Sequence, residues 1–205
     1  MLDHLVYAVP NLDEAIDDID RRFGVRATPG GKHQGRGTHN ALLALGNGGY
    51  LEIIGPDPEQ KNVSGPMPFG IDRLSGPRVV SWAAKAPGID ARVERARGAG
   101  FDPGPVEAMT RDTPAGDRLS WRLTRRDTPA GDGLVPFLID WGDTPHPSAA
   151  CAQGCTLVRL EAEHPDADGV RAMLEAVGEP LEVRKSERAA LIALIRTPKG
   201  EVRLR

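Results

Sequence analysis

Two apolar stretches of the chain each contain one residue that could do acid–base or metal chemistry. Residues 2–9 (Leu-Asp-His-Leu-Val-Tyr-Ala-Val) have the pattern of a buried strand with His4 inside it. Residues 50–54 (Tyr-Leu-Glu-Ile-Ile) repeat this pattern with Glu52 in the middle. Side chains alternate between the two faces of a strand, and a buried carboxylate almost always has a partner charge, hydrogen-bond donors or a metal ion. We therefore expect His4 and Glu52 to face a shared polar concavity.

The elements that must position these two residues can be read from the pattern of residues 1–55. After the first strand, Asn11 is a plausible N-cap of a helix with an apolar stripe. Residues 29–37 are so rich in glycine that we expect a loop there. Two further strands follow, and Asn47-Gly48 between them is a strong hairpin signal. We interpret residues 1–55 as a first βαβββ unit, by analogy with the two later units, in which three strands follow each helix.

The same order of elements occurs twice more along the chain. A proline-rich connector separates the first unit from a second βαβββ unit at residues 79–142, and a third βαβββ-like unit occupies residues 155–205. A repeat of this kind is a strong indication of architecture even where the sequences of the units differ. The predicted fold class is therefore α+β, with tandem βαβββ modules.

Several short motifs add a family resemblance to this order. They are Leu2-Asp-His-Leu-Val-Tyr-Ala8, Gly30-Gly-Lys-His33, Tyr50-Leu-Glu-Ile-Ile54, Met109-Thr-Arg111-Asp112 and Pro136-Phe-Leu-Ile-Asp140-Trp141. In combination they resemble the vicinal oxygen chelate (VOC) superfamily, which includes glyoxalase I, the extradiol dioxygenases and the bleomycin-resistance proteins. The resemblance is closest to its glyoxalase-like domain proteins. It implies that two of the units form a half-open barrel, with a metal ion held by the first and last strands of each unit.

Carried over by position, this resemblance implies His4, Glu52 and Asp140 as metal ligands. The fourth position falls near Ser81, which is a poor ligand for a divalent ion. Two interpretations stay open. In one, His4, Glu52 and Asp140 hold a divalent metal such as Zn, Ni, Mn or Fe. In the other, His4 is hydrogen-bonded to Glu52 in a polar network, inside a cleft that binds a ligand without metal. If the protein is an enzyme, His4 and Glu52 are the candidate catalytic groups, as anchors of a metal or as a base.

Further residues are candidates for binding a substrate. By strand parity Thr38 and Asn40 share a face and could donate hydrogen bonds, while His33 lies in the glycine-rich stretch. Arg111 could pair with an anionic group, although an exposed hairpin arginine is an equally good interpretation. Trp121 could stack on a ligand or pack in the core. The glycine-rich stretch lacks the Lys-Ser/Thr of a P-loop, so we expect no nucleotide cofactor.

Composition excludes several partners. The net charge of −3 argues against nucleic acid or an anionic membrane as a partner. No apolar run reaches the ~18 residues of a transmembrane helix. Cys151 and Cys155 are too few for a disulfide framework, and we expect free thiols in a cytoplasmic protein.

Two functions fit these observations. The first is an enzyme of lyase, isomerase or dioxygenase type that acts on a small oxygenated, anionic metabolite. The second is a non-catalytic small-molecule binder or resistance-type protein of the same fold. The low aromatic content of 4% favours the enzyme, because resistance proteins line their clefts with aromatic residues. The third unit would leave an apolar sheet face open, so we expect it to pack against its own copy in a homodimer. The alternative is that it folds back onto the first two units and keeps the chain monomeric.

Overall fold

The computed structural model describes residues 1–60, 65–112, 116 and 118–205, and it contains the expected three βαβββ units in sequence order. The first unit consists of β1 (Leu2–Ala8), α1 (Leu12–Phe23), β2 (Thr28–His33), β3 (Thr38–Ala44) and β4 (Tyr50–Pro56). The second consists of β5 (Arg78–Lys85), α2 (Ile89–Gly98), β6 (Val106–Asp112), β7 (Arg118–Thr124) and β8 (Phe137–Asp140). The third consists of β9 (Thr156–His164), α3 (Ala167–Ala176), β10 (Glu182–Lys185), β11 (Ala190–Thr197) and β12 (Gly200–Leu204).

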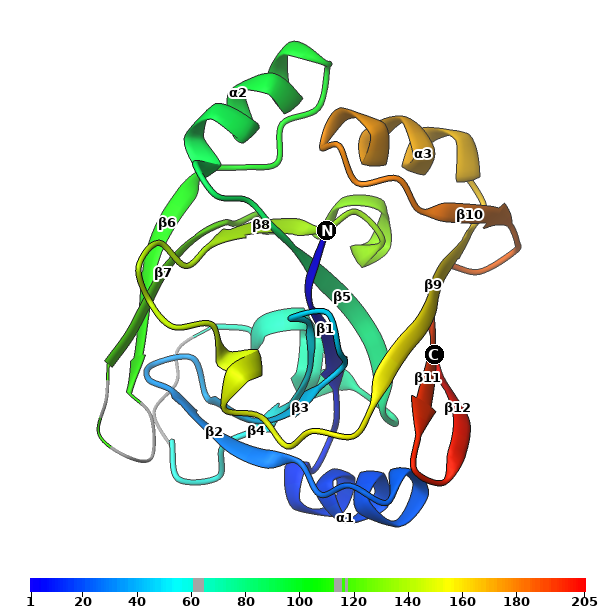
Figure 1. Cartoon of the computed structure of the whole chain (residues 1–205). Coiled ribbons are helices and arrows are strands. Elements are labelled where there is room, and N and C mark those ends of the chain that lie inside the picture. Colours follow the sequence, from blue (N-terminus) through cyan, green and yellow to red (C-terminus); the bar gives the residue numbers. More distant parts are fainter. Residues whose placement is uncertain (61–64, 113–115, 117) are drawn as a thin grey trace.

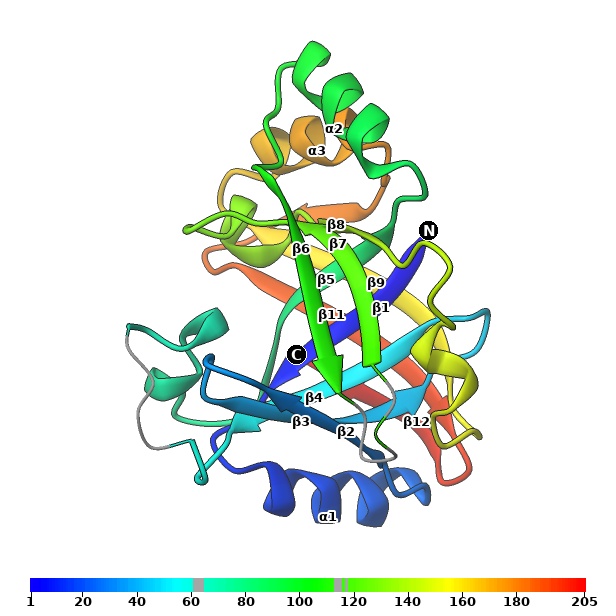
Figure 2. The ribbon, with the colours of Figure 1, turned by 90° about the vertical axis from the view of Figure 1, so that its left-hand side faces the viewer.

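The first two units join in one eight-stranded sheet with the order β2-β3-β4-β1-β5-β8-β7-β6. Its two halves have the same internal order, and they meet where β1 pairs antiparallel with β5. The sheet curls into the half-open barrel that the family resemblance implies, with α1 and α2 on its outer side (Figures 1 and 2). No helix among the described residues is long and apolar enough to cross a membrane.

Helix α1 begins and ends where its sequence dictates. The side chain of Asn11 accepts hydrogen bonds from the backbone N–H groups of Asp13 and Glu14, and Gly24 ends the helix in the left-handed region at φ 75°. Its buried residues Leu12, Ile19 and Phe23 belong to the same core as the outer face of β1. This packing fixes which face of β1 is left for the inside of the barrel.

The prediction of a loop at residues 29–37 is wrong for its first half, because Thr28–His33 form strand β2. This strand lies at one edge of the sheet and pairs only with β3. A proline or glycine is tolerated there because no further strand needs backbone hydrogen bonds from its other side. The turn at Asn47-Gly48 is confirmed, with φ values of 49° and 71°.

The third unit forms its own four-stranded sheet, and this sheet packs on the barrel. Its strand order is β10-β9-β11-β12. Here the first strand, β9, has the second strand, β10, as its parallel partner, whereas in the first unit the parallel partner of β1 is the last strand, β4. Leu191, Ala193 and Ile195 of β11 share one buried core with the outer face of the barrel. The backbone N–H of Leu157 also donates to the carbonyl of Leu45 at 2.8 Å. The third unit thus folds back onto the first two units, and this packing covers its apolar face within the chain.

Residues 141–155 connect β8 to β9 and are called the crossing segment below. This segment passes over the open side of the barrel and contains a short 3-10 helix, Pro147–Ala149 (Figure 1). Ala152 binds it to the first unit, because its carbonyl accepts from Ala44 N–H and its N–H donates to the Thr28 hydroxyl, both at 2.9 Å. Cys151 and Cys155 are free thiols, as expected, and both are buried.

Arg92 of α2 joins the second and third units. Its guanidinium donates to the carbonyls of Lys85 at 2.6 Å and Val177 at 2.8 Å, and it pairs with the buried carboxylate of Glu179 at 2.5 Å. Arg92 therefore satisfies acceptors on both sides of the junction.

We predict that Arg92→Met lowers the free energy of unfolding by about 3 kcal/mol, because it leaves the Glu179 carboxylate with less compensation in a buried place. Urea denaturation measures this loss, and amide hydrogen exchange should locate it in β9 and α3. The matched control is Arg97→Met, since Arg97 is largely exposed and pairs with exposed Glu94 and Asp102. An equal effect of the two substitutions would contradict the prediction.

Candidate functional site

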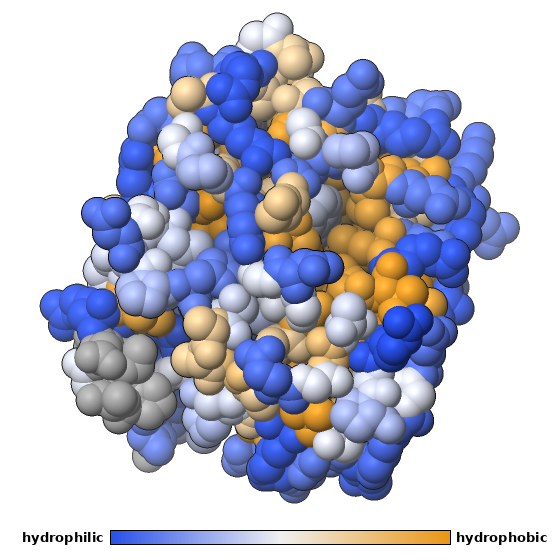
Figure 3. Space-filling model, in the orientation of Figure 1, coloured by the Kyte–Doolittle hydropathy of each residue, from blue (hydrophilic) through white to orange (hydrophobic). Residues whose placement is uncertain are grey.

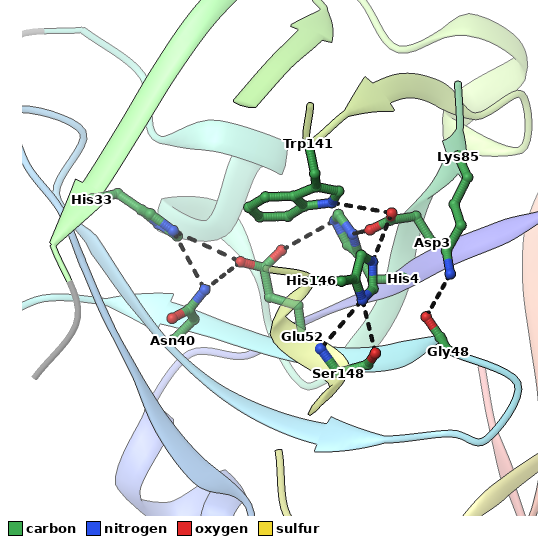
Figure 4. A network of polar contacts seen from close by, with 10 residues as sticks. All are labelled: Asp3, His4, His33, Asn40, Gly48, Glu52, Lys85, Trp141, His146 and Ser148. Atoms are coloured by element: carbon green, nitrogen blue, oxygen red, sulfur yellow. Dashed lines mark hydrogen bonds and ion pairs between the residues drawn. The ribbon is translucent and has the colours of Figure 1, made fainter. Parts of the chain in front are cut away.

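The structure brings His4 and Glu52 together on the inner face of the barrel. Nε2 of His4 lies 3.8 Å from Oε2 of Glu52 (Figure 4). The His4 ring stacks on Tyr50 with a centroid distance of 4.7 Å. Their strands β1 and β4 are parallel neighbours in which His4 pairs with Tyr50 and Val6 with Glu52. Strand parity alone predicts this meeting, because the opposite faces of β1 and β4 pack on the core under α1.

A third residue, the acidic Asp3, completes this group. In the pairing of β1 with β5, Leu2 lies opposite Ala84 and His4 opposite Ala83, so Asp3 is the extra residue of a β-bulge. Its fully buried carboxylate contacts Nδ1 of His4 at 2.7 Å. Two donors from the crossing segment bind its other oxygen: Nε1 of Trp141 at 3.1 Å and Nε2 of His146 at 2.9 Å.

The contacts of Asp3 decide its ionisation and the tautomer of His4. Burial tends to raise the pKa of Asp3, but the hydrogen bonds from His146 and His4 outweigh it and hold the pKa well below its usual range. An ionised carboxylate only accepts hydrogen bonds, so Nδ1 of His4 carries a proton and donates it. In the neutral imidazole the lone pair is then on Nε2, on the side that faces Glu52.

The far side of Glu52 is bound by residues of β2 and β3. Nδ2 of Asn40 donates to Oε1 of Glu52 at 2.5 Å, and Nε2 of His33 lies 3.8 Å from the same oxygen. Nδ1 of His33 in turn contacts the hydroxyl of Thr38 at 2.9 Å. Burial lowers the pKa of His33, and Glu52 opposes this shift while the positive charge of Arg111 adds to it. His33 is therefore neutral at physiological pH.

Arg111 and Trp121 come from β6 and β7 of the second unit. Arg111 is 7% exposed, and its Nη1 atom has no hydrogen-bonding partner among the described residues. Trp121 is half-buried and lies against Trp141, with ring centroids 5.0 Å apart. The structure therefore places both residues by the inner face rather than on an exposed hairpin.

Asp140 does not join this group, and its expected place beside His4 and Glu52 is wrong. Its carboxylate accepts from the backbone N–H of Gly88 at 2.9 Å and of Ile89 at 3.4 Å, so it caps the N-terminus of α2. The sheet register shows which residue takes the position instead. In the first unit, Glu52 pairs with Val6, and Val6 lies two residues after His4. In the second unit, Phe137 pairs with Ala83, and Ala83 lies two residues after Ser81. Phe137 is thus the counterpart of Glu52.

This comparison of the two halves tests whether a four-ligand metal site fits. The second unit offers the Ser81 hydroxyl and the Phe137 ring where the first offers His4 and Glu52. Within the described part of the chain, no three His, Cys, Asp or Glu side chains are arranged to hold a metal ion. The donor set does not fit a metal site with three or four protein ligands, and we derive no chemical step through a metal.

Sequence reasoning missed Asp3 and His146. Parity assigns Asp3 to the face opposite His4, and only the bulge reverses this. His146 lies in a linker without periodicity, 143 residues from its partner. The adjacency of Asp and His in the first strand was the one signal that could have indicated a carboxylate–imidazole pair.

Comparison with known proteins agrees with the fold. A family model described as a glyoxalase-like domain matches residues 2–178. This chain belongs to the glyoxalase-like domain family. A hypothetical protein from Staphylococcus aureus matches with a TM-score of 0.69 and 14% identity, over 92% of this chain and 87% of that one. None of the curated proteins matches.

Methylmalonyl-CoA epimerases are also among the solved structures with some similarity to this glyoxalase-like protein. The enzyme from Mycobacterium tuberculosis is 24% identical with a TM-score of 0.45, over 72% of this chain and 91% of that one. A variant of the Streptomyces coelicolor epimerase, in complex with 2-nitronate-propionyl-CoA, is 18% identical with a TM-score of 0.44, over 72% of this chain and 98% of that one.

We predict that Gly30→Ala disturbs the site. A Cβ atom at residue 30 would clash with Oδ1 of Asn40, so the amide must move away from Glu52. The expected loss is about 1–3 kcal/mol in the free energy of unfolding. Gly76→Ala is the control, because its Cβ would meet no atom within 4 Å. Equal urea midpoints for the two variants would contradict the prediction.

We also predict a pH dependence that belongs to Asp3. A carboxyl whose pKa is lower in the folded than in the unfolded state stabilises the protein above its unfolded pKa of about 4, and this contribution is lost as the pH falls below that value. Wild type should therefore lose more stability than Asp3→Asn between about pH 5 and pH 3. Urea denaturation of both proteins at a series of pH values measures the difference. Parallel curves would count against an ionised, hydrogen-bonded Asp3.

Proposed function

We propose that this glyoxalase-like protein is an enzyme that moves a proton on a small oxygenated metabolite, with His4 and Glu52 as its acid–base pair. The observation that carries the proposal is the 3.8 Å separation of His4 Nε2 and Glu52 Oε2, with Asp3 behind the imidazole. At 3.8 Å the two groups are too close to enclose a carbon atom, so a substrate would bind beside the pair, give its proton to one group and receive a proton from the other.

The surroundings of the pair suit this chemistry. An ionised carboxylate on Nδ1 orients an imidazole and stabilises the imidazolium that forms when Nε2 takes a proton. The stacked Tyr50 and the edge of Phe137 hold the ring from two sides. In the proposed step, the proton on a carbon next to a carbonyl passes to one base, and the electron pair of the C–H bond moves to the carbonyl oxygen. Return of a proton to carbon completes an isomerase-type reaction. In a lyase-type reaction the electron pair instead expels a leaving group from the neighbouring carbon, and that group takes the abstracted proton.

The second candidate is a non-catalytic small-molecule binder of the same fold. One observation favours it: Tyr50, Phe137, Trp121 and Trp141 bring aromatic rings to the inner face, more than the low aromatic content suggests. In that case the polar chain from Asp3 to His33 would only orient a ligand. Catalytic turnover separates the two functions.

Three further expectations stay predictions. They are a divalent metal ion on His4 and Glu52, a cytoplasmic location and a homodimer. Light scattering tests the dimer, and metal analysis of purified, tag-free protein tests the ion.

The test of the proposed function is proton–deuterium exchange in D2O, followed by NMR, on a panel of small 2-oxo, 3-oxo and 2-hydroxy acids. Wild type should exchange at least one member. His4→Gln and Glu52→Gln should each slow this exchange by roughly 10²–10⁴-fold, because each removes one acid–base group. Glu59→Gln is the matched control, since Glu59 is exposed and pairs only with Lys32 among the described residues.

Two outcomes would contradict the proposal. One is a wild-type rate in Glu52→Gln, and the other is a panel in which wild type exchanges nothing above the protein-free rate. Exchange that stops with a chelator and returns with a divalent ion would assign the chemistry to a metal, whereas exchange that survives the chelator supports the acid–base pair alone.

A further inference from the structure

A buried guanidinium with one nitrogen unsatisfied within the described part of the chain, that of Arg111, lies by the inner face of the barrel. The Nη1 atom of Arg111 is buried and has no partner among the described residues. On the neighbouring strand pair, Met109 lies opposite Trp121, which contacts Trp141 by the site, and Arg111 follows Met109 by two residues on the same face. A buried guanidinium without an acceptor is costly, so a protein that keeps one there has an acceptor to offer it at some stage.

A second guanidinium approaches the same region from the turn between β2 and β3. Arg36 is half-buried, and its contact is the weak acceptor Sδ of Met109 at 3.6 Å. Burial lowers the pKa of Arg36, and the nearby charge of Arg125 lowers it further. The charges of Arg111 and Arg36 both reach His33, where they oppose its protonation. Glu52, Arg111 and Arg36 thus all lie close enough to His33 for their charges to act on it.

We propose that Arg111, assisted by Arg36, binds a carboxylate group of the substrate, while His4 and Glu52 act on the carbon next to it. This inference rests on the proposed function and adds the substrate class: a small organic acid with its reacting carbon close to the carboxylate. A guanidinium matches the planar carboxylate, and the electric field of both Arg111 and Glu52 reaches Tyr50 and His33. The anion-binding end and the acid–base end are therefore parts of one site.

The charge of the site favours a carboxylate over a phosphate. A phosphate group brings a second negative charge and another acceptor oxygen. The charges of Glu52, Arg111 and Arg36 all act on His33, so a dianion bound there would meet more repulsion from Glu52 than a singly charged carboxylate would. The two anions make separate arms of the test.

The experiment measures binding of malonate, its neutral analogue malonamide and inorganic phosphate by titration calorimetry and by the thermal midpoint. Wild type should bind malonate at least about tenfold more tightly than malonamide or phosphate. Malonamide has no charge to strengthen its hydrogen bonds with Arg111, and phosphate matches the planar guanidinium less well than a carboxylate does. Arg111→Met should weaken malonate binding by about tenfold or more. Without ligand, Arg111→Met should raise the thermal midpoint by roughly 2–4 °C, since it removes a buried unpaired cation.

Arg122→Met is the matched control, because Arg122 is exposed and pairs with Asp90 at 2.7 Å outside the barrel. Glu52→Gln separates this proposal from the proposed function: it should abolish proton exchange yet keep malonate binding. Equal malonate affinity of wild type and Arg111→Met would overturn the carboxylate site, and so would a wild-type protein that binds none of the probes. Preference for phosphate would overturn the carboxylate assignment. In Glu52→Gln, malonate binding that stays intact while proton exchange is lost would support the carboxylate site at Arg111 and Arg36.

Discussion

The carboxylate of Asp3 is the constraint on which the site depends. It is fully buried, and an ionised group in such a place persists only if donors surround it. His4, His146 and Trp141 supply these donors from two parts of the chain that lie more than a hundred residues apart. One carboxylate therefore orients the imidazole that faces Glu52 and also binds the crossing segment over the open side of the barrel (Figure 4). The orientation of the His4 ring and the position of the crossing segment therefore both depend on Asp3.

The two halves of the barrel share their strand order but not their chemistry. The register places Ser81 and Phe137 in the second half where His4 and Glu52 lie in the first. The polar chain is thus built almost wholly by the first unit, and the second unit contributes an aromatic wall and the cation of Arg111. Most of the face seen in Figure 3 is hydrophilic, with hydrophobic residues gathered around its middle, in the region of β5 and β9 where the third unit packs on the barrel.

Much of this could be predicted from periodicity. The order of elements, the inward faces of His4 and Glu52 and the hairpin at Asn47 all follow from local patterns. What could not be predicted depends on non-local geometry. A one-residue bulge brings Asp3 to His4, and the cap of α2 draws Asp140 away. Strand β2 forms in spite of its glycines because β3 supplies its partner. The third unit repeats the order of elements with a different strand order, since its sheet is shaped by the barrel that it covers.

The barrel is open along one boundary, where the two edge strands of the sheet are not joined by backbone hydrogen bonds among the described residues. Strands β2 and β6 are the two edges of the eight-stranded sheet, and they approach one another through side chains such as Arg36 and Met109. Side-chain contacts of this kind open at far less cost than a hydrogen-bonded ladder. The same boundary carries the side chains of Arg36 and Arg111, whereas His4 and Glu52 lie on strands β1 and β4 in the middle of the sheet. An anion that enters between β2 and β6 would therefore meet the guanidinium groups first and would be held by them with its far end directed toward His4 and Glu52.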